Sequence, residues 1–353
     1  MTRLLQDIRN EPAELLKCLN HNLGPGRASV EEAAKMTRMA ANAFITGIGS
    51  SWHAGMAVQS FLHAAGRTAC LLDASELLHH VKFPPNSVLM ILSRSGKSVE
   101  VVKLLEKSAA AEVPVIAVTN TPDSPLARQA AVVLRLEAAF DNCVSISMYS
   151  ALALVGSLVT AAASGAPLDS LHAPLTTMLE SACEFLPRWE TAIERSDWLD
   201  ANAPCYFLAR GASAASAYET RLLWEEAAKA PATSMTTGGF RHGPQEMIAL
   251  GTRIGIWVDP RVLSSQDIQL ARDLRKLGCK TMLVGANLPN DAAELVLPVP
   301  QVKGAEVWQF LVDIIPAQLA SEALARKRGV DPDTFRICSY IIEAEGGLTT
   351  ATT

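Results

Sequence analysis

The chain has 353 residues, of which 49% are hydrophobic and 19% are charged, and its formal net charge is −5. This composition excludes an intrinsically disordered protein, and the length fits two domains of ordinary size or one large α/β unit. The negative charge comes without a block of basic residues, so neither nucleic acid nor an anionic membrane is expected as a partner.

Membrane insertion, secretion and metal binding are not expected from the sequence. No apolar run approaches the roughly 20 residues of a membrane-spanning helix, and the N-terminal residues mix charges with leucines where a secretory signal has an apolar core. The seven cysteines are scattered singly, without a CxxC pattern or a paired histidine, which predicts buried thiols in a reducing compartment. We therefore expect a cytoplasmic protein without a metal or another cofactor.

Helices and short apolar strands alternate along the first half of the chain. The opening segment predicts a helix interrupted near Pro12, followed by an amphipathic helix at 29–39. The next predicted elements are strands at 43–48, 69–72, 88–92 and 115–119 and helices at 52–65 and 99–112. The alanine-rich stretch 150–186 predicts two helices broken around 164–167. Strands separated by helices of this length indicate right-handed crossovers and a parallel sheet.

The pattern repeats in the second half. A strand at 205–209, a turn of small residues at Gly211–Ser213 and a helix at 214–229 mirror the turn at Gly49 and its helix, and segments 253–258, 265–277 and 281–285 add a further strand, helix and strand. We predict an α/β fold of two doubly wound subdomains, each a parallel sheet flanked by helices. The predicted boundaries are a helical segment at 1–40, a first subdomain at 41–190, and a second subdomain with a C-terminal tail at 191–353.

The most informative turn joins the strand at 88–92 to the helix at 99–112. It contains three serines, a glycine and two cations, in the order Ser93, Arg94, Ser95, Gly96, Lys97 and Ser98. Hydroxyl groups, backbone N–H groups and a helix N-terminus together suit a phosphate dianion. The alternative is an ordinary N-cap, but a cap needs only one hydroxyl. In the second half the corresponding segment begins with Asp259, which would repel phosphate, so one phosphate site per chain is expected.

A second polar turn, Gly47 to His53, follows the first strand. It could be an ordinary tight turn, or a dinucleotide-binding fingerprint with Asp73 as the ribose contact. The third glycine of that fingerprint is missing, and Trp52 would crowd a pyrophosphate. Ser50 and Ser51 instead predict a second wall of hydroxyls at the carboxyl edge of the sheet, where open α/β sheets bind ligands.

Two candidates for proton transfer lie in the second half. Glu225 and Glu226 are adjacent on a predicted helix, so they point about 100° apart and only one can face a cleft; an exposed charged face is the alternative interpretation. A glycine-flanked loop at 236–244 then presents His242 next to Arg241. A single histidine is more often structural, but one on such a loop has the near-neutral pKa of a proton carrier.

Together these segments resemble the sugar isomerase (SIS) family, in particular the isomerase half of glucosamine-6-phosphate synthase and the stand-alone sugar-amine deaminases and fructosamine-6-phosphate deglycases. The resemblance covers nearly the whole chain and is strongest at 93–98 and 241–244, with further matches at 8–12 and 74–77. No glutamine-hydrolysing domain precedes these segments, so ammonia channelled from glutamine is not expected.

The resemblance implies a sugar phosphate as the ligand and assigns roles to individual residues. Glu226 is implied as the catalytic base, and His242 as the residue that assists ring opening, reaching the site from the second subunit of a homodimer; a tetramer stays possible. The residues implied in substrate binding are Ser50, Ser51, Ser93, Arg94, Ser95, Ser98, Ser145 and Glu219.

The chain also departs from the synthase pattern. Leu223, Met148 and Tyr340 stand where the synthase has lysines, and Asp141 where it has a glutamate. Without those lysines the synthase mechanism cannot run unchanged, whereas deglycases and deaminases act on substrates that bring their own amine. We therefore expect an enzyme that isomerises, deaminates or deglycates a ketosamine or aminosugar phosphate through proton transfer at C1 and C2. The alternative is a phosphosugar-binding regulator that has lost catalysis.

Overall fold

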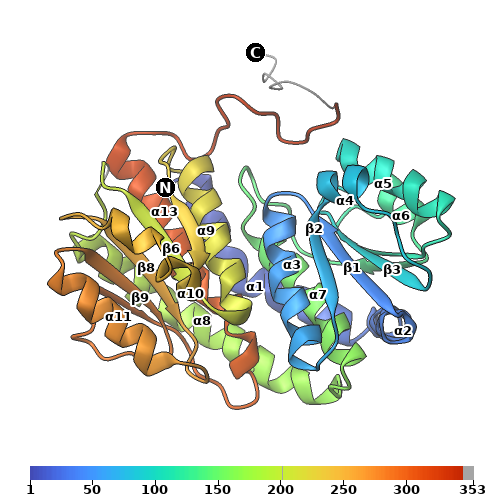
Figure 1. Ribbon diagram of the computed structural model, residues 1–353, viewed down its shortest axis with the longest axis horizontal. Coiled ribbons are helices and arrows are strands. Elements are labelled where there is room, and N and C mark those ends of the chain that lie inside the picture. Colours follow the sequence, from blue (N-terminus) through green and yellow to red (C-terminus); the bar gives the residue numbers. More distant parts are fainter. Residues whose placement is uncertain (201, 345–353) are drawn as a thin grey trace. The chain divides into compact units, whose positions relative to one another are not determined.

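The computed structural model describes residues 1–200 and 202–344, and the chain divides into two compact units (Figure 1). The first, here called the phosphate-turn unit, comprises Ala13–Ala173 and the C-terminal segment from Phe335. The second, here called the histidine-loop unit, comprises Met1–Pro12 and Pro174–Thr334. Helices α1 (Arg3–Leu23) and α8 (Asp169–Arg195) each contribute residues to both units.

The phosphate-turn unit contains a five-stranded parallel sheet with the order β2-β1-β3-β4-β5. Its strands are β1 (Asn42–Gly47), β2 (Ala69–Asp73), β3 (Ser87–Leu92), β4 (Val115–Thr119) and β5 (Val132–Arg135). Its helices are α2 (Arg27–Met39), α3 (Ser50–Ala64), α4 (Ala74–His80), α5 (Val99–Ala110), α6 (Pro125–Gln129) and α7 (Ser147–Ala163). Helices α2 and α3 pack against α7, whereas α4 and α6 pack against α5, so helices cover both faces.

The histidine-loop unit repeats this plan, with the strand order β10-β9-β8-β6-β7. Its strands are β6 (Cys205–Ala209), β7 (Thr233–Thr236), β8 (Arg253–Val258), β9 (Lys280–Gly285) and β10 (Leu295–Pro298). Its α-helices are α9 (Ala214–Glu226), α10 (Thr237–Phe240), α11 (Ser264–Lys276), α12 (Phe310–Asp313) and α13 (Ile315–Arg328), with 3₁₀ turns η1 (Gly211–Ser213), η2 (Pro244–Met247) and η3 (Glu306–Trp308). Matched strand by strand from β1 and β6, the two sheets have the same order, which confirms the predicted pair of doubly wound subdomains.

The prediction of a break near Pro12 is wrong. Helix α1 is continuous from Arg3 to Leu23, with Pro12 inside it. A proline removes one backbone hydrogen bond from a helix. Here the apolar face of α1 is fully buried at Ile8, Leu15 and Leu19, and this packing compensates for the missing bond. The predicted helix pair at 150–186, by contrast, is confirmed as α7 and α8.

Three strands were not predicted from the sequence: β5, β7 and β10. All three lie at an edge of their sheet and are only four residues long. Edge strands are covered by few neighbours and need no continuous apolar run, so the hydrophobic pattern identifies them poorly. β7, with the sequence Thr-Ser-Met-Thr, is the clearest case.

The cysteines are all unpaired, and four of them are buried: Cys18, Cys143, Cys205 and Cys279. The expectation of buried thiols is wrong for Cys183, which α8 exposes to solvent. In the part of the chain that the structure describes, no cluster of three or more His, Cys, Asp or Glu side chains is placed to bind a metal ion. Nor does any helix among residues 1–200 and 202–344 combine the length and hydropathy of a bilayer crossing.

Candidate functional site

The phosphate turn, residues Ser93 to Ser98, joins the carboxyl end of β3 to the N-terminus of α5. Gly96 has φ +62°, and a Cβ atom there would lie 2.4 Å from Ser124 Oγ, so only glycine fits this position. The Gly96 N–H donates to Ser93 Oγ at 3.1 Å, and the Lys97 N–H donates to Ser95 Oγ at 3.3 Å. In both contacts the serine oxygen is the acceptor, which leaves each hydroxyl hydrogen available to a ligand.

The ordinary N-cap is not what this turn forms. Ser98 occupies the N-cap position of α5, yet its side chain makes no capping hydrogen bond. Real caps exist nearby: Ser124 Oγ accepts the Ala127 N–H at the start of α6, at 3.2 Å. The Ser98 hydroxyl thus remains at the positive end of a 12-residue helix without a capping role.

The two cations of the turn are available to an anion. Neither Arg94 nor Lys97 forms an ion pair with any residue in the described ranges 1–200 and 202–344, and Lys97 is exposed. The backbone at Arg94 is fixed, because its carbonyl accepts hydrogen bonds from Asn120 N–H and the Thr119 and Thr121 hydroxyls, each at 3.2 Å. The turn therefore combines a fixed backbone with two cations that no described carboxylate neutralises.

Ser51, in the second polar turn, lies near the end of β3. Strands β1 and β3 are neighbours in the sheet. From β1 the chain continues to β2 on one side of this pair, and from β3 it continues to β4 on the other side. A Cβ atom on Gly47 would meet Ser51 at 2.8 Å and the Leu92 carbonyl oxygen at 3.0 Å, so the two turns approach closely there. Ser50 and Ser51 begin α3 and are both partly buried.

Asp73, the ribose contact of the dinucleotide-binding alternative, is engaged in capping a helix. The Asp73 carboxylate caps α4 by accepting the Ser75 N–H at 2.9 Å. Asp141 is engaged in the same way: its carboxylate accepts the N–H groups of Ile146, Ser147 and Met148 at 2.8, 3.0 and 3.0 Å at the start of α7. Ser145 lies just before this helix and is partly buried.

The acidic residues of the histidine-loop unit differ in exposure. On α9, Glu225 is exposed and pairs with Arg221 at 2.7 Å, whereas its neighbour Glu226 is partly buried. This difference is the one that helical geometry predicts for adjacent residues. Glu219, earlier on α9, is fully buried. The helix ends at Glu226, and the Lys229 ammonium group fixes the exit by donating to the carbonyl groups of Glu226 and Thr334.

The segment predicted to be a loop around His242 contains the helical turn α10. The Thr236 hydroxyl caps α10 by accepting the Gly239 N–H at 3.0 Å, and the His242 N–H donates to the Gly239 carbonyl at 3.1 Å. Gly243 follows with φ +131°, which ends the turn. His242 itself is exposed. Its backbone is therefore held while its imidazole faces solvent.

The counterpart of the phosphate turn in the histidine-loop unit is engaged internally. Asp259 pairs with Arg261 at 2.6 Å.

The buried carboxyl group of Asp313 accepts hydrogen bonds from the hydroxyls of Ser213 and Ser216 at 2.7 and 2.5 Å. Burial raises the pKa of Asp313 to about 7, although these hydroxyls oppose the shift. Asp313 was not predicted as notable, since it stands singly in an apolar run.

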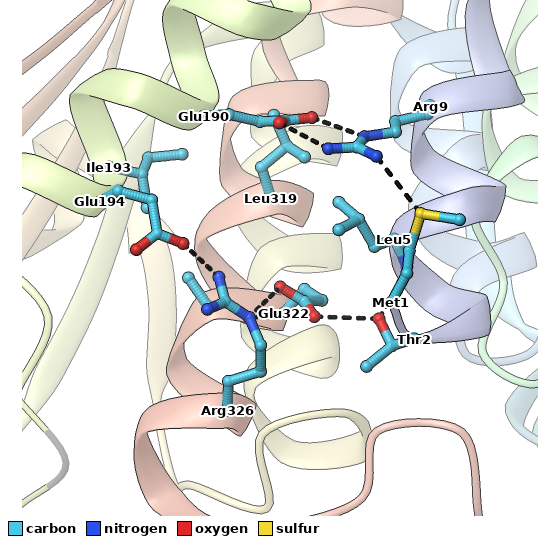
Figure 2. A pocket seen from close by; sticks show the side chains of 11 residues that line it. Met1, Thr2, Leu5, Arg9, Glu190, Ile193, Glu194, Leu319, Glu322 and Arg326 are labelled. Carbon is cyan, nitrogen blue, oxygen red and sulfur yellow. Dashed lines mark hydrogen bonds and ion pairs between the residues drawn. The ribbon is translucent and has the colours of Figure 1, made fainter.

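The histidine-loop unit also has a cavity of about 330 Å³ between α1, α8 and α13 (Figure 2). Both arginines that line it are engaged by carboxylates. Arg9 forms two hydrogen bonds to Glu190, at 2.8 and 2.7 Å, and Arg326 pairs with Glu194 and with the buried Glu322. Because no arginine there is left for a phosphate, this cavity does not compete with the phosphate turn.

The chain is similar to one known domain family and to several known proteins. Residues 37–164 match the SIS domain. Over 97% of its length the chain is 25% identical to a glutamine–fructose-6-phosphate aminotransferase (isomerizing) of Pyrobaculum aerophilum, of which it covers 57%. The corresponding protein of Methanothermobacter thermautotrophicus is 25% identical over 94% of the chain and 55% of its own length. The chain thus spans less than two thirds of these curated relatives.

Solved structures have the same fold at lower identity. The C-terminal domain of glucosamine-fructose-6-phosphate aminotransferase from Francisella tularensis has a TM-score of 0.82 and 21% identity, covering 95% of this chain and 98% of its own. A glucosamine-6-phosphate deaminase from Thermotoga maritima has a TM-score of 0.80 and 17% identity, covering 97% and 99%. A tagatose-6-phosphate ketose/aldose isomerase from Escherichia coli has a TM-score of 0.81 and 18% identity, covering 95% and 96%.

Proposed function

We propose that the protein is an enzyme that acts on a ketosamine or aminosugar phosphate, and the match of residues 37–164 to the SIS domain supports this proposal. The observation that carries this proposal is the phosphate turn. Its serine hydroxyls are available as donors, Arg94 and Lys97 lack acidic partners among the described residues, and a helix N-terminus adds positive potential. These groups bind the phosphate, and Ser50, Ser51 and Ser145 complete the binding wall.

Glu226 acts as the base. It removes a proton from the carbon next to the carbonyl or imine of the open-chain substrate and returns it to the neighbouring carbon. The C=O or C=N double bond thereby passes from one of the carbons C1 and C2 to the other. With a ketosamine this step places a C=N bond at C1. Water then adds to C1, the C1–N bond breaks, and the leaving nitrogen takes up a proton to depart as the amine. His242 assists ring opening by transferring a proton, and the buried Glu219 is a second acidic residue of the site.

The missing lysines favour a substrate that carries its own nitrogen. Leu223 and Met148 are fully buried, so their positions present apolar side chains and no amine. Tyr340 cannot form a Schiff base. An enzyme of this composition therefore relies on proton transfer and hydrolysis, as deamination and deglycation require. We further propose a homodimer in which His242, exposed on its turn, serves the site of the second copy.

A phosphosugar-binding regulator without catalysis is the second candidate, and the same missing lysines favour it. The two are separated by incubating the protein with glycated amino acid 6-phosphates and aminosugar 6-phosphates and measuring amine release. The enzyme is supported by turnover that Glu226→Gln abolishes and the matched variant Glu225→Gln retains. Saturable binding without turnover across the whole panel identifies the regulator instead.

A further inference from the structure

The C-terminal segment from Phe335 belongs to the same compact unit as the phosphate turn and contacts it directly. The guanidinium carbon of Arg94 lies 4.1 Å from the centroid of the Tyr340 ring. Farther along the segment, the Ile342 carbonyl accepts the Val99 N–H at 3.2 Å, at the start of α5. The segment therefore contacts both the cation of the turn and the helix that follows it.

The contact with the ring leaves the donors of Arg94 usable. A guanidinium group has five N–H donors in its plane, and stacking on an aromatic ring occupies only a face of that plane. No carboxylate within the described ranges pairs with Arg94. An anion can thus bind the edge of the guanidinium while the ring restricts its orientation. Lys97, at the other end of the turn, is exposed and has no aromatic partner within 1–200 or 202–344.

The ring is itself held by a rigid element. The Tyr340 hydroxyl donates to the backbone carbonyl of Asp141 at 3.1 Å. The Asp141 carboxylate in turn accepts three consecutive N–H groups at the start of α7, a helix buried along its whole length. The position of the ring is therefore set by α7 as well as by the C-terminal segment.

We propose that Tyr340 is a positioning residue whose ring holds the Arg94 guanidinium in the orientation that binds the phosphate, so that the C-terminal segment and the phosphate turn form one anion site. The inference rests on the proposed function for the identity of the ligand. Because Arg94 is shared, docking of the segment and binding of the phosphate strengthen each other by the same factor. Where the synthase pattern has a tail lysine, this chain thus has a tyrosine with a different role, which it performs through Arg94.

Trypsin cleavage after Arg336, which is exposed within the segment, reports on docking. We expect glucose 6-phosphate to slow this cleavage in the unaltered protein but not in Tyr340→Ala, which binds the sugar phosphate about 10-fold more weakly. Tyr340→Phe keeps the stacking ring and loses only the part-buried hydrogen bond to the Asp141 carbonyl, so its affinity should fall less than that of Tyr340→Ala. Arg94→Lys keeps the charge but not the planar stacking group, and behaves as Tyr340→Ala does. Ile337→Ala, at an exposed position of the segment, is the control and changes neither measurement.

Equal affinity and equal protection in Tyr340→Ala and the unaltered protein would overturn the inference while leaving the proposed function intact. If no hexose 6-phosphate binds the unaltered protein, the proposed function fails. The rate of trypsin cleavage without ligand then still tests the contact between Arg94 and Tyr340. In that case Tyr340→Ala and Arg94→Lys should both be cut faster than the unaltered protein and Ile337→Ala. Identical rates in all four proteins would rule out the Arg94–Tyr340 contact as an anchor of the segment.

Discussion

The hydroxyl group of Ser213 donates a hydrogen bond of 2.7 Å to the carboxyl group of Asp313, which is fully buried in the histidine-loop unit. Strand β6 corresponds to β1, so the turn that carries Ser213 corresponds to the turn that carries Ser51. One unit thus presents serines at the start of α3, while the other fills the start of α9 with a carboxyl group of its own. The internal repeat conserves the backbone plan and not the chemistry.

Asp313→Asn is expected to flatten the pH dependence of stability. The pKa of Asp313 is raised to about 7 by burial and by the neighbouring Asp259, from 3.8 for a free aspartate. Between these values the unfolded chain ionises first, so the free energy of unfolding falls as pH rises from about 4 to about 7, by about 4 kcal/mol in total. The asparagine variant lacks this decline, because an amide does not ionise in this pH range. Denaturant titrations at several pH values measure the free energy of unfolding of both proteins.

The matched control for that series is Asp291→Asn, an exposed site that pairs with Arg272 at 3.7 Å. It should keep the decline of the unaltered protein. A decline of the same size in Asp313→Asn would contradict the assignment of the titration to Asp313.

Gly96→Ala is expected to lower the free energy of unfolding by about 2–4 kcal/mol and to abolish binding of hexose 6-phosphates. The added Cβ would lie 2.4 Å from Ser124 Oγ, at a backbone φ of +62°. Gly66→Ala separates the two causes, because Gly66 has φ +72° but no atom within 4 Å of its added Cβ. It should cost only the backbone strain, about 1–2 kcal/mol, with binding unchanged. Equal costs at the two sites would mean that the turn has room for a side chain.

Ser98→Ala should weaken glucose 6-phosphate binding about 10-fold, since a hydrogen bond to a charged group is lost. Its effect on stability should be small, because the Ser98 hydroxyl makes no capping bond. Asp73→Ala should give the reverse result, because that carboxylate does cap α4: about 1 kcal/mol of stability is lost and binding stays the same. Calorimetric titration and thermal unfolding measure the two effects. A large loss of stability in Ser98→Ala with unchanged affinity would restore the ordinary N-cap interpretation.

Glu226→Gln should reduce turnover at least about 100-fold while leaving the affinity for sugar phosphate nearly unchanged, since the base is lost and the phosphate turn is intact. Glu225→Gln, one residue earlier, removes only an exposed ion pair with Arg221 and should keep full activity. Amine release and calorimetric titration measure the two quantities. Normal turnover in Glu226→Gln would exclude this residue as the base.

The sequence alone determined the parts of this protein that depend on local patterns. The central strands are continuous apolar runs, the helices between them have regular spacing, and the phosphate turn places hydroxyls, a glycine and cations within a few residues. The alternation of strands and helices is a local pattern, so it predicted the two parallel sheets. The donor groups of the turn are neighbours in the chain, so the sequence was enough to propose a phosphate-bearing ligand.

Tertiary structure decided what depends on residues far apart in the chain. Burial of its apolar face keeps α1 continuous through Pro12, the fold buries Asp313 beside Ser213 and Ser216, and the C-terminal segment brings Tyr340 to Arg94. The edge strands β5, β7 and β10 are likewise recognised by their pairing with the neighbouring strands and not by their sequences. The hydrophobic pattern along the chain predicts none of these contacts. Each contact arises from packing between segments that are far apart in the sequence, and their separation in the sequence does not say how close they lie in space.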